Sequence, residues 1–174
     1  EGARMYFSLG RMTPEELQNH MIQRVNVCWG LKEGNSGLSP EGPPRNVADA
    51  DAGDLVNPAD PQGWHDLPEA DGPGFRRARR IDVSRDAATG AIRIDAAFQD
   101  SARRKHGGRV AIHEYNIAAT IDAASGELLT LVPEPRILPF SECPGAVHNT
   151  QRLVGSPIDA IRGEVLARLR GPEG

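Results

Sequence analysis

The sequence contains only two cysteines, Cys28 and Cys143. Two cysteines are too few for a disulfide scaffold, so we expect a reduced, cytoplasmic protein without an essential disulfide. The sequence also lacks any apolar run near the roughly 20 residues that a membrane-spanning helix needs. No segment has the pattern of a signal peptide. These absences predict a protein that has no membrane partner.

Excess positive charge is missing as well, since the formal net charge is −4. Proteins that neutralise phosphates are usually basic, so no nucleic-acid partner is expected. Aromatic residues make up only 5% of the chain, which favours a core of Ile, Val, Leu and Ala. With 174 residues and 39% hydrophobic content, the chain is long enough to bury a sizeable core.

Several well-known catalytic motifs are also absent. No Gly-rich phosphate loop follows a strand, and no Gly-x-Ser-x-Gly elbow exists, so nucleotides and the usual serine hydrolase chemistry are not expected. Zinc ligands could be drawn from His113, Cys143 and His148, but the spacing of known zinc motifs is missing. The sequence therefore predicts neither a cofactor nor a metal site.

Composition divides the chain into three parts. Residues 1–31 form an N-terminal helical segment, residues 32–74 a loop or linker rich in Pro and Gly, and residues 75–174 the core domain. The helix is predicted over 13–29, where Thr13 and Glu16 make a capping box. Its apolar face either docks on the domain or pairs with a second copy. Within the linker, the Trp64-His65 pair is either a small anchor on the domain or a lid.

The core domain begins with alternating apolar and polar residues, which predict strands. Short turns at 88–90 and 123–126 connect them, so we expect an antiparallel β-meander of about four strands. Proline cannot donate to a strand ladder, so Pro133 and Pro135 are expected to end the last strand. The expected strands lie near 81–83, 92–98, 110–122 and 128–132.

Two C-terminal helices follow the strands. The first is predicted from Pro144 to Leu153, and the second from Ser156, with Pro157 at its first position. The predicted buried stripe of the second helix comprises Ile158, Ile161, Val165, Leu166 and Leu169. Strands followed by helices predict an α+β fold, with a pocket between the sheet and these helices.

Several segments occur in a familiar order, and they are Arg79-Arg-Ile-Asp-Val83, Asp95-Ala-Ala-Phe-Gln-Asp-Ser101, His113-Glu-Tyr115, Leu138-Pro-Phe-Ser-Glu-Cys-Pro144 and Leu153-Val-Gly155. Together they resemble a bacterial family of unknown function, DUF2889, over about residues 75–174. The resemblance implies a fold unit and a set of positions, and it carries no activity.

Three reactive side chains gather at the predicted start of the first C-terminal helix: Glu142, Cys143 and His148. A helix N-terminus lowers the pKa of a thiol, so Cys143 is a candidate nucleophile with His148 as its base. Glu142 would oppose that shift. The alternative is that Cys143 is a buried structural residue, because free cysteine is among the most buried residue types.

The third predicted strand carries titratable residues between apolar ones. His113 and Tyr115 point to one face, as a candidate acid/base and hydrogen-bond donor, and Glu114 points to the other, as a candidate acid. Either face could line the pocket. The alternative is a solvent-facing strand on which Glu114 pairs with Arg80 or Arg93.

The run from Arg76 to Arg80 contains four arginines. Arg79 and Arg80 are candidates to bind a carboxylate or phosphate of a ligand. The alternative is that these arginines pair with nearby aspartates, which are Asp82, Asp86, Asp95 and Asp100.

Two functional hypotheses follow. In the first, the domain binds or acts on a small organic acid or acyl-type metabolite, through lyase-like or hydrolase-like acid/base chemistry. In the second, it is a non-catalytic binding or assembly subunit that grips a partner with its N-terminal helix and Pro-rich loop. The sequence leaves open whether the protein is an enzyme and whether it is a homo-oligomer.

Overall fold

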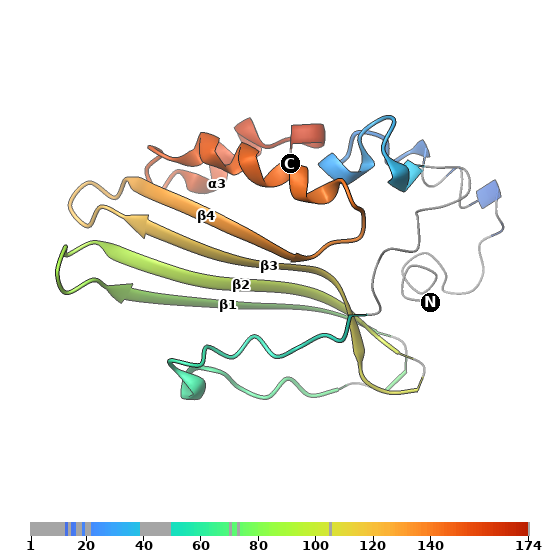
Figure 1. Ribbon diagram of the computed structural model, residues 1–174, viewed down its shortest axis with the longest axis horizontal. Helices are drawn as coiled ribbons and strands as arrows, with labels where there is room; N and C mark the ends of the chain where they lie inside the picture. The colour runs from blue at the N-terminus through green and yellow to red at the C-terminus, as the bar shows by residue number, and fades with distance from the viewer. Residues whose placement is uncertain are drawn as a thin grey trace.

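One antiparallel sheet organises the molecule (Figure 1). The computed structural model describes residues 13, 15, 16, 19, 22–38, 50–69, 71, 72, 74–104 and 106–173. The strands lie in the sheet in sequence order, and they are β1 (Phe75–Arg85), β2 (Ile92–Arg103), β3 (Arg109–Ile121) and β4 (Leu128–Ile137). The predicted four-stranded meander and α+β class are therefore confirmed.

The β1–β2 and β3–β4 hairpins use the same turn, Asp86-Ala-Ala-Thr-Gly90 in one and Asp122-Ala-Ala-Ser-Gly126 in the other. In each turn one oxygen of the aspartate accepts two backbone N–H groups, which lowers the pKa of both carboxyls. The last residue of each turn has a φ near +75°, which glycine adopts without strain. These turns set the register of both hairpins.

Strand β4 continues through its prolines, so the prediction that they end the strand is wrong. Pro133 pairs with Ile117, and Pro135 pairs with Tyr115. The reason is the position of β4 at the edge of the sheet, where proline is tolerated because one side of the strand has no ladder to complete.

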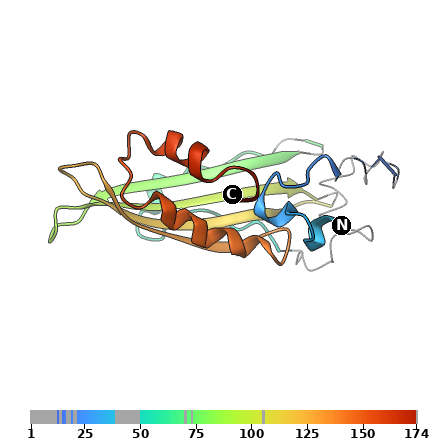
Figure 2. The same ribbon diagram turned by 90° about the horizontal axis from the view of Figure 1, so that it is seen from above.

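Two helical elements lie along one face of the sheet (Figures 1 and 2). The first is a 3-10 helix, η4 (Cys143–Leu153), which packs on β4, and the second is α3 (Ile161–Arg168), which contacts η4. Leu153 is 4% exposed and buries against Ala119, Ile121 and Leu128. Ile161 and Leu169 complete this main core.

The second C-terminal helix begins at Ile161, later than predicted. Pro157 instead bridges to Glu127, and the Ile158 N–H donates to the Gly126 carbonyl, so this stretch extends the edge of the hairpin. The predicted buried stripe is wrong for three of its five members, since Ile158 and Val165 are exposed and Leu166 is 58% exposed. The short helix turns only its ends toward the core.

The predicted N-terminal helix is not seen over residues 23–38 of the described chain. The capping box between Thr13 and Glu16 forms, but residues 23–28 are turns, and they lead into two short 3-10 helices, η1 (Trp29–Leu31) and η2 (Ser36–Leu38). Asn26 causes the change, because it adopts a φ of 61° while its side chain accepts the Glu33 N–H. Two members of the predicted apolar face, Leu17 and Met21, lie outside the described residues.

The N-terminal segment (residues 22–38) packs on the C-terminal helices. Helix η1 contacts both η4 and the terminal 3-10 helix η5 (Gly171–Glu173). The Gly145 Cα approaches Trp29 so closely that an added Cβ would lie 2.4 Å from Nε1 of the indole ring. The segment therefore belongs to the layer on the helical side of the sheet.

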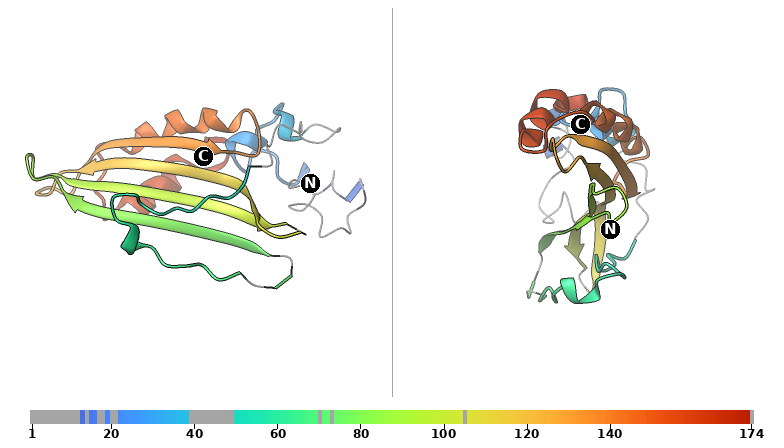
Figure 3. Two further views of the ribbon diagram at one scale, coloured as in Figure 1. Left: turned by 60° about the horizontal axis from the view of Figure 1, so that its bottom comes forward. Right: turned by 90° about the vertical axis from the view of Figure 1, so that its left-hand side faces the viewer.

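Residues 50–69, which we call the strap, cross the opposite face of the sheet (Figure 3). The strap contains a short 3-10 helix, η3 (Pro61–Gly63). Leu55 buries against Ala78 and Ala97, and Trp64 and Leu67 pack around them. Trp64 thus behaves as the predicted anchor. In the part of the chain that the structure describes, no helix has the length and apolar character to cross a membrane.

Candidate ligand-binding site

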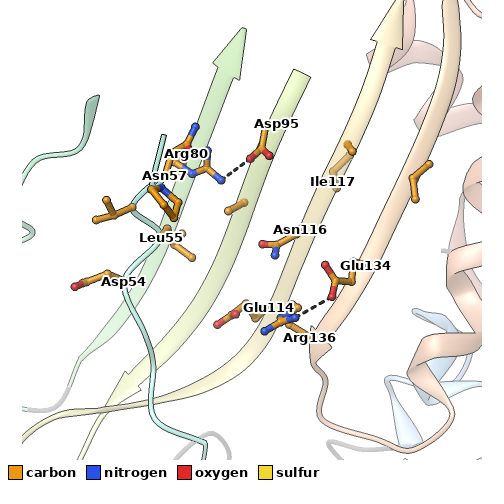
Figure 4. A pocket seen from close by; sticks show the side chains of 15 residues that line it. Asp54, Leu55, Asn57, Arg80, Asp95, Glu114, Asn116, Ile117, Glu134 and Arg136 are labelled. Atoms are coloured by element: carbon orange, nitrogen blue, oxygen red, sulfur yellow. Dashed lines mark hydrogen bonds and ion pairs between the residues drawn. The ribbon is translucent and has the colours of Figure 1, made fainter. Parts of the chain in front are cut away.

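A cavity of about 470 Å³ lies between the strap and the face of the sheet opposite the helices (Figure 4). Strap residues 54–58 form one wall, and side chains from all four strands form the rest. We call it the Arg80 cavity, and its polar lining residues are Asp54, Asn57, Arg80, Asp95, Glu114, Asn116, Glu134 and Arg136. The pocket was predicted on the other side of the sheet, between the strands and the C-terminal helices, where Leu153 and its neighbours instead fill a core.

Arg80 is engaged by carboxylates of its own sheet. Its guanidinium forms ion pairs with Asp82 and, at 2.5 Å, with Asp95, and its side chain is only 12% exposed. The buried Nε atom has no hydrogen-bond partner among the described residues. The aspartate pairing predicted as the alternative for the arginine run thus occurs at Arg80.

Glu114 is held by a glutamine that the sequence reasoning missed. Gln99 is 4% exposed, and its amide donates to the Glu114 carboxylate at 2.8 Å and to the strap carbonyl of Gly53 at 2.9 Å. Arg93, one of the partners predicted for Glu114, instead pairs with Asp86. Gln99 therefore connects the strap to the acid at the end of the cavity. No sequence signal distinguishes Gln99 from other polar strand residues, because its two partners come from distant segments.

The residues that line the Arg80 cavity carry more negative than positive charge. Four carboxylates line it, from Asp54, Asp95, Glu114 and Glu134, against two guanidinium groups. Arg136 pairs with Glu134 at 2.8 Å, as Figure 4 shows, and about half of its side chain stays exposed. A ligand that neutralises this site therefore needs a cationic group.

A second cavity of about 450 Å³ lies on the other side of Leu55, next to Trp64. Its charged edge is closed by Glu69, whose carboxylate bridges Arg76 at 3.0 Å and Arg109 at 3.1 Å. The strap therefore supplies an ion-pair partner for both arginines within the molecule.

His113 and Tyr115 lie on the helical side of the sheet, away from both cavities. The carboxylate of Asp100 lies 3.6 Å from His113 Nδ1 and forms a two-pronged ion pair with Arg77. Burial lowers the pKa of His113, and Arg77 lowers it further, while Asp100 opposes them. His113 is therefore mainly neutral near pH 7, as a general base must be.

Cys143 and Tyr115 are neighbours on this side. Burial raises the pKa of the Cys143 thiol to about 11, with Cys28 and Glu142 adding to the effect. Burial also raises the pKa of Tyr115, and the two cysteines reinforce the shift. Cys143 is thus a protonated thiol at neutral pH, which favours the structural alternative for this residue.

Glu142 and His148 contact the N-terminal segment. The Glu142 carboxylate accepts hydrogen bonds from the backbone and hydroxyl of Ser36, and the His148 ring lies edge-on to Trp29 with centroids 5.2 Å apart. Glu142, in the turn before η4, therefore attaches the N-terminal segment to the rest of the chain.

The remaining predicted ligand-binding residue, Arg79, extends over the ring of Phe98, and Arg77 does the same. Their guanidinium carbons lie 5.8 Å and 5.0 Å from the ring centroid. Of the residues that the structure describes, no three His, Cys, Asp or Glu side chains gather in a way that could hold a metal ion.

The fold and site define an α+β domain in which a four-stranded antiparallel meander carries helices on one face and a strap with two cavities on the other. The chain belongs to the family described as "Protein of unknown function (DUF2889)", whose model matches residues 75–174. No curated protein matches the chain, and no solved structure does. The family match covers residues 75–174 and gives no information on the chemistry of the chain.

Proposed function

We propose that the domain binds a small amphoteric organic acid, such as an α-amino acid, in the Arg80 cavity. The observation that supports this proposal is the excess of carboxylates around a cavity that also has an exposed arginine at its rim. A ligand with one cationic and one anionic group would match both features.

Each half of such a ligand has a partner. Glu114 uses one carboxylate oxygen for Gln99, which leaves the other to accept hydrogen bonds from a ligand ammonium group. Arg136 is the more exposed of the two arginines, so its guanidinium is the natural partner of the ligand carboxylate. Ala97 and Ala118 leave room above the strands for a short aliphatic part.

Isothermal titration with amino acids, diamines and dicarboxylic acids tests the proposal. We expect amino acids to bind best, and Glu114→Gln to weaken binding about tenfold or more, because a hydrogen bond to a charged group is lost. Asp159→Asn is the matched control, since Asp159 is exposed beside the C-terminal helices. Preferential binding of dicarboxylic acids, or an unchanged Glu114→Gln variant, would exclude this ligand class.

A second candidate function is acid/base catalysis on the helical side of the sheet. It is favoured by the neutral His113 beside Asp100, with Tyr115 on the same strand. Turnover of acyl and organic-acid substrates would be screened, and His113→Gln should abolish it while His106→Gln, at an exposed loop position, should not. Equal activity of the two variants would remove His113 from the mechanism.

The assembly hypothesis now has less support from the segments first chosen for it. The N-terminal segment contacts η4 and η5, and the strap packs on Ala78 and Ala97, so both are engaged within the molecule. Among the described residues, a partner surface is therefore sought outside these two segments.

A further inference from the structure

The two edges of the sheet differ in how they are protected. Strand β4 carries Pro133 and Pro135, and proline lacks the N–H that a pairing strand requires. Strand β1 has eleven residues, Phe75–Arg85, without a proline. Among the described residues, only β2 forms a strand ladder with it. An edge of this length is a ready template for another strand.

In β1, the backbone N–H and C=O groups of the odd-numbered residues point toward the open edge. At one end the Asp86 N–H donates to the Ala91 carbonyl, and at the other the Arg103 N–H donates to the Gly74 carbonyl. Both bonds involve even-numbered residues on the β1 side, Asp86 and Gly74. In an antiparallel ladder every second residue of a strand is hydrogen-bonded to a given neighbour, so the even-numbered residues of β1 bond to β2. Residues such as Ile81 and Val83 therefore direct their N–H and C=O groups away from the sheet.

Those odd-numbered positions also carry the exposed apolar side chains of β1. Ile81 is 64% exposed and Val83 is 65% exposed, although both lie mid-strand. Charged residues usually guard such an edge. Here Arg77 and Arg79 instead fold back over Phe98 on their own sheet. The edge is therefore long and apolar at Ile81 and Val83, with charged residues on either side of this apolar centre.

Charge selects how a second copy could pair with this edge. A two-fold axis through Arg80 places two guanidinium groups directly opposite each other, and an axis through Asp82 does the same with two carboxylates. Like charges directly opposite are destabilising. An axis through Ile81 instead places each Arg80 opposite Asp82 of the other copy, twice by symmetry. It aligns residues 77–85 of both strands.

We propose that the protein forms a homodimer in which two β1 strands pair antiparallel about Ile81, giving one continuous eight-stranded sheet. The Ile81 residues form a hydrogen-bonded pair at the axis, and Val83 packs across from the aliphatic part of Arg79. Arg77 faces Arg85 at each end, where Asp100 neutralises Arg77 within its own copy. The dimer does not depend on the proposed ligand, because none of these pairs needs the cavity to be filled.

Sedimentation velocity over a range of concentrations tests the proposal first. The unmodified chain should sediment as a dimer, and Ile81→Lys should sediment as a monomer with unchanged circular dichroism, because it buries a charge at the axis. Val132→Lys is the matched control, since Val132 is 60% exposed on the other edge strand. A monomer at every concentration, or a dimer that persists in Ile81→Lys, would overturn the proposal.

Cysteine cross-linking tests the register. In a hydrogen-bonded pair the Cα atoms are about 5.5 Å apart, within the range of a disulfide. Ile81→Cys should therefore form an intermolecular disulfide under mild oxidation, identified by peptide mapping. Val83→Cys should not, because its counterpart lies opposite position 79, about 13 Å further along the strand. Cross-linking of Val83→Cys without Ile81→Cys would show that a different register forms.

Discussion

Ser36 is bound to Glu142 across 106 positions of sequence. The backbone N–H and the hydroxyl of Ser36 donate to the two carboxylate oxygens at 3.0 Å and 2.8 Å. Ser141 adds a third hydrogen bond at 3.0 Å. These bonds attach the N-terminal segment to the turn that begins η4, and the bond from the Ser36 backbone is the main cause of the lowered pKa of Glu142.

Glu142→Gln should destabilise the fold by about 1–2 kcal/mol, since hydrogen bonds to a charged group weaken when the charge is removed. The lowered pKa gives the sign of the pH dependence. The contribution of Glu142 is present above its ordinary pKa of 4.5 and is lost as the pH falls through the lower value of the folded protein. Urea unfolding at neutral and acidic pH measures both effects.

Glu33→Gln is the control for this measurement, because Glu33 is exposed in the same segment and only its backbone N–H is hydrogen-bonded among described residues. It should change stability little. If both variants lose the same stability at neutral pH, the carboxylate of Glu142 does not anchor the segment.

Gly145→Ala should destabilise the protein by about 1–3 kcal/mol, the usual cost of overpacking. The added methyl group would lie 2.4 Å from Nε1 of Trp29 and must displace the ring. Tryptophan fluorescence together with thermal unfolding measures the effect. Gly163→Ala is the matched control, since no atom lies within 4 Å of its added Cβ in α3, and it should stabilise by about 0.5–1 kcal/mol.

Leu153→Ala should destabilise the protein by about 2–5 kcal/mol, as expected when a buried leucine leaves a cavity. Leu166→Ala should change stability by less than about 0.5 kcal/mol, because that side chain is 58% exposed. Chemical denaturation of the two variants compares them directly. A large loss in Leu166→Ala alone would mean that α3 is rotated from the orientation described.

His113 should titrate below its ordinary pKa of 6.5 in an NMR experiment, because burial disfavours its charged form. Asp100→Asn should lower the pKa further, since the carboxylate raises it. Arg77→Gln should raise it, because that change removes a positive charge and releases Asp100. A pKa that ignores both variants would show that the ring does not face this ion pair.

The two thiols should differ in reactivity. Both cysteines are free, Cys28 is half-buried, and Cys143 is buried with a pKa of about 11. An aromatic disulfide reagent should therefore modify Cys28 in the native protein and Cys143 only after denaturation. Reducing agent should leave the melting temperature unchanged, whereas a clear drop would reveal a disulfide between them.

The sheet could be predicted from sequence because its information is local. Alternating side chains mark each strand, and the Asp86 and Asp122 turns encode hairpins within five residues. The outcome at the predicted N-terminal helix could not be predicted from periodicity. Asn26 leaves the helical conformation because it forms hydrogen bonds with Leu31 and Glu33, and a pattern of apolar residues does not reveal such bonds.

The candidate site was less accessible to sequence reasoning. Glu114 and Arg80 were recognised, but the face on which they open depends on the docking of the strap through Leu55, one of the few apolar residues in a largely polar stretch. Gln99 looks like any polar strand residue until Gly53 and Glu114 converge on its amide. Such contacts between distant segments have no signature in the order of the residues.

The repeated hairpin turn also has a consequence for how the chain folds. Asp86 and Asp122 each close a loop between adjacent strands, and a short loop joins Arg103 to Arg109, so all of the sheet pairing can form from contacts close in sequence, which are fast to make. The Ser36–Glu142 contact requires the closure of a far longer loop. The order that these loop lengths favour is the sheet first, and last the arrival of the N-terminal segment on its surface.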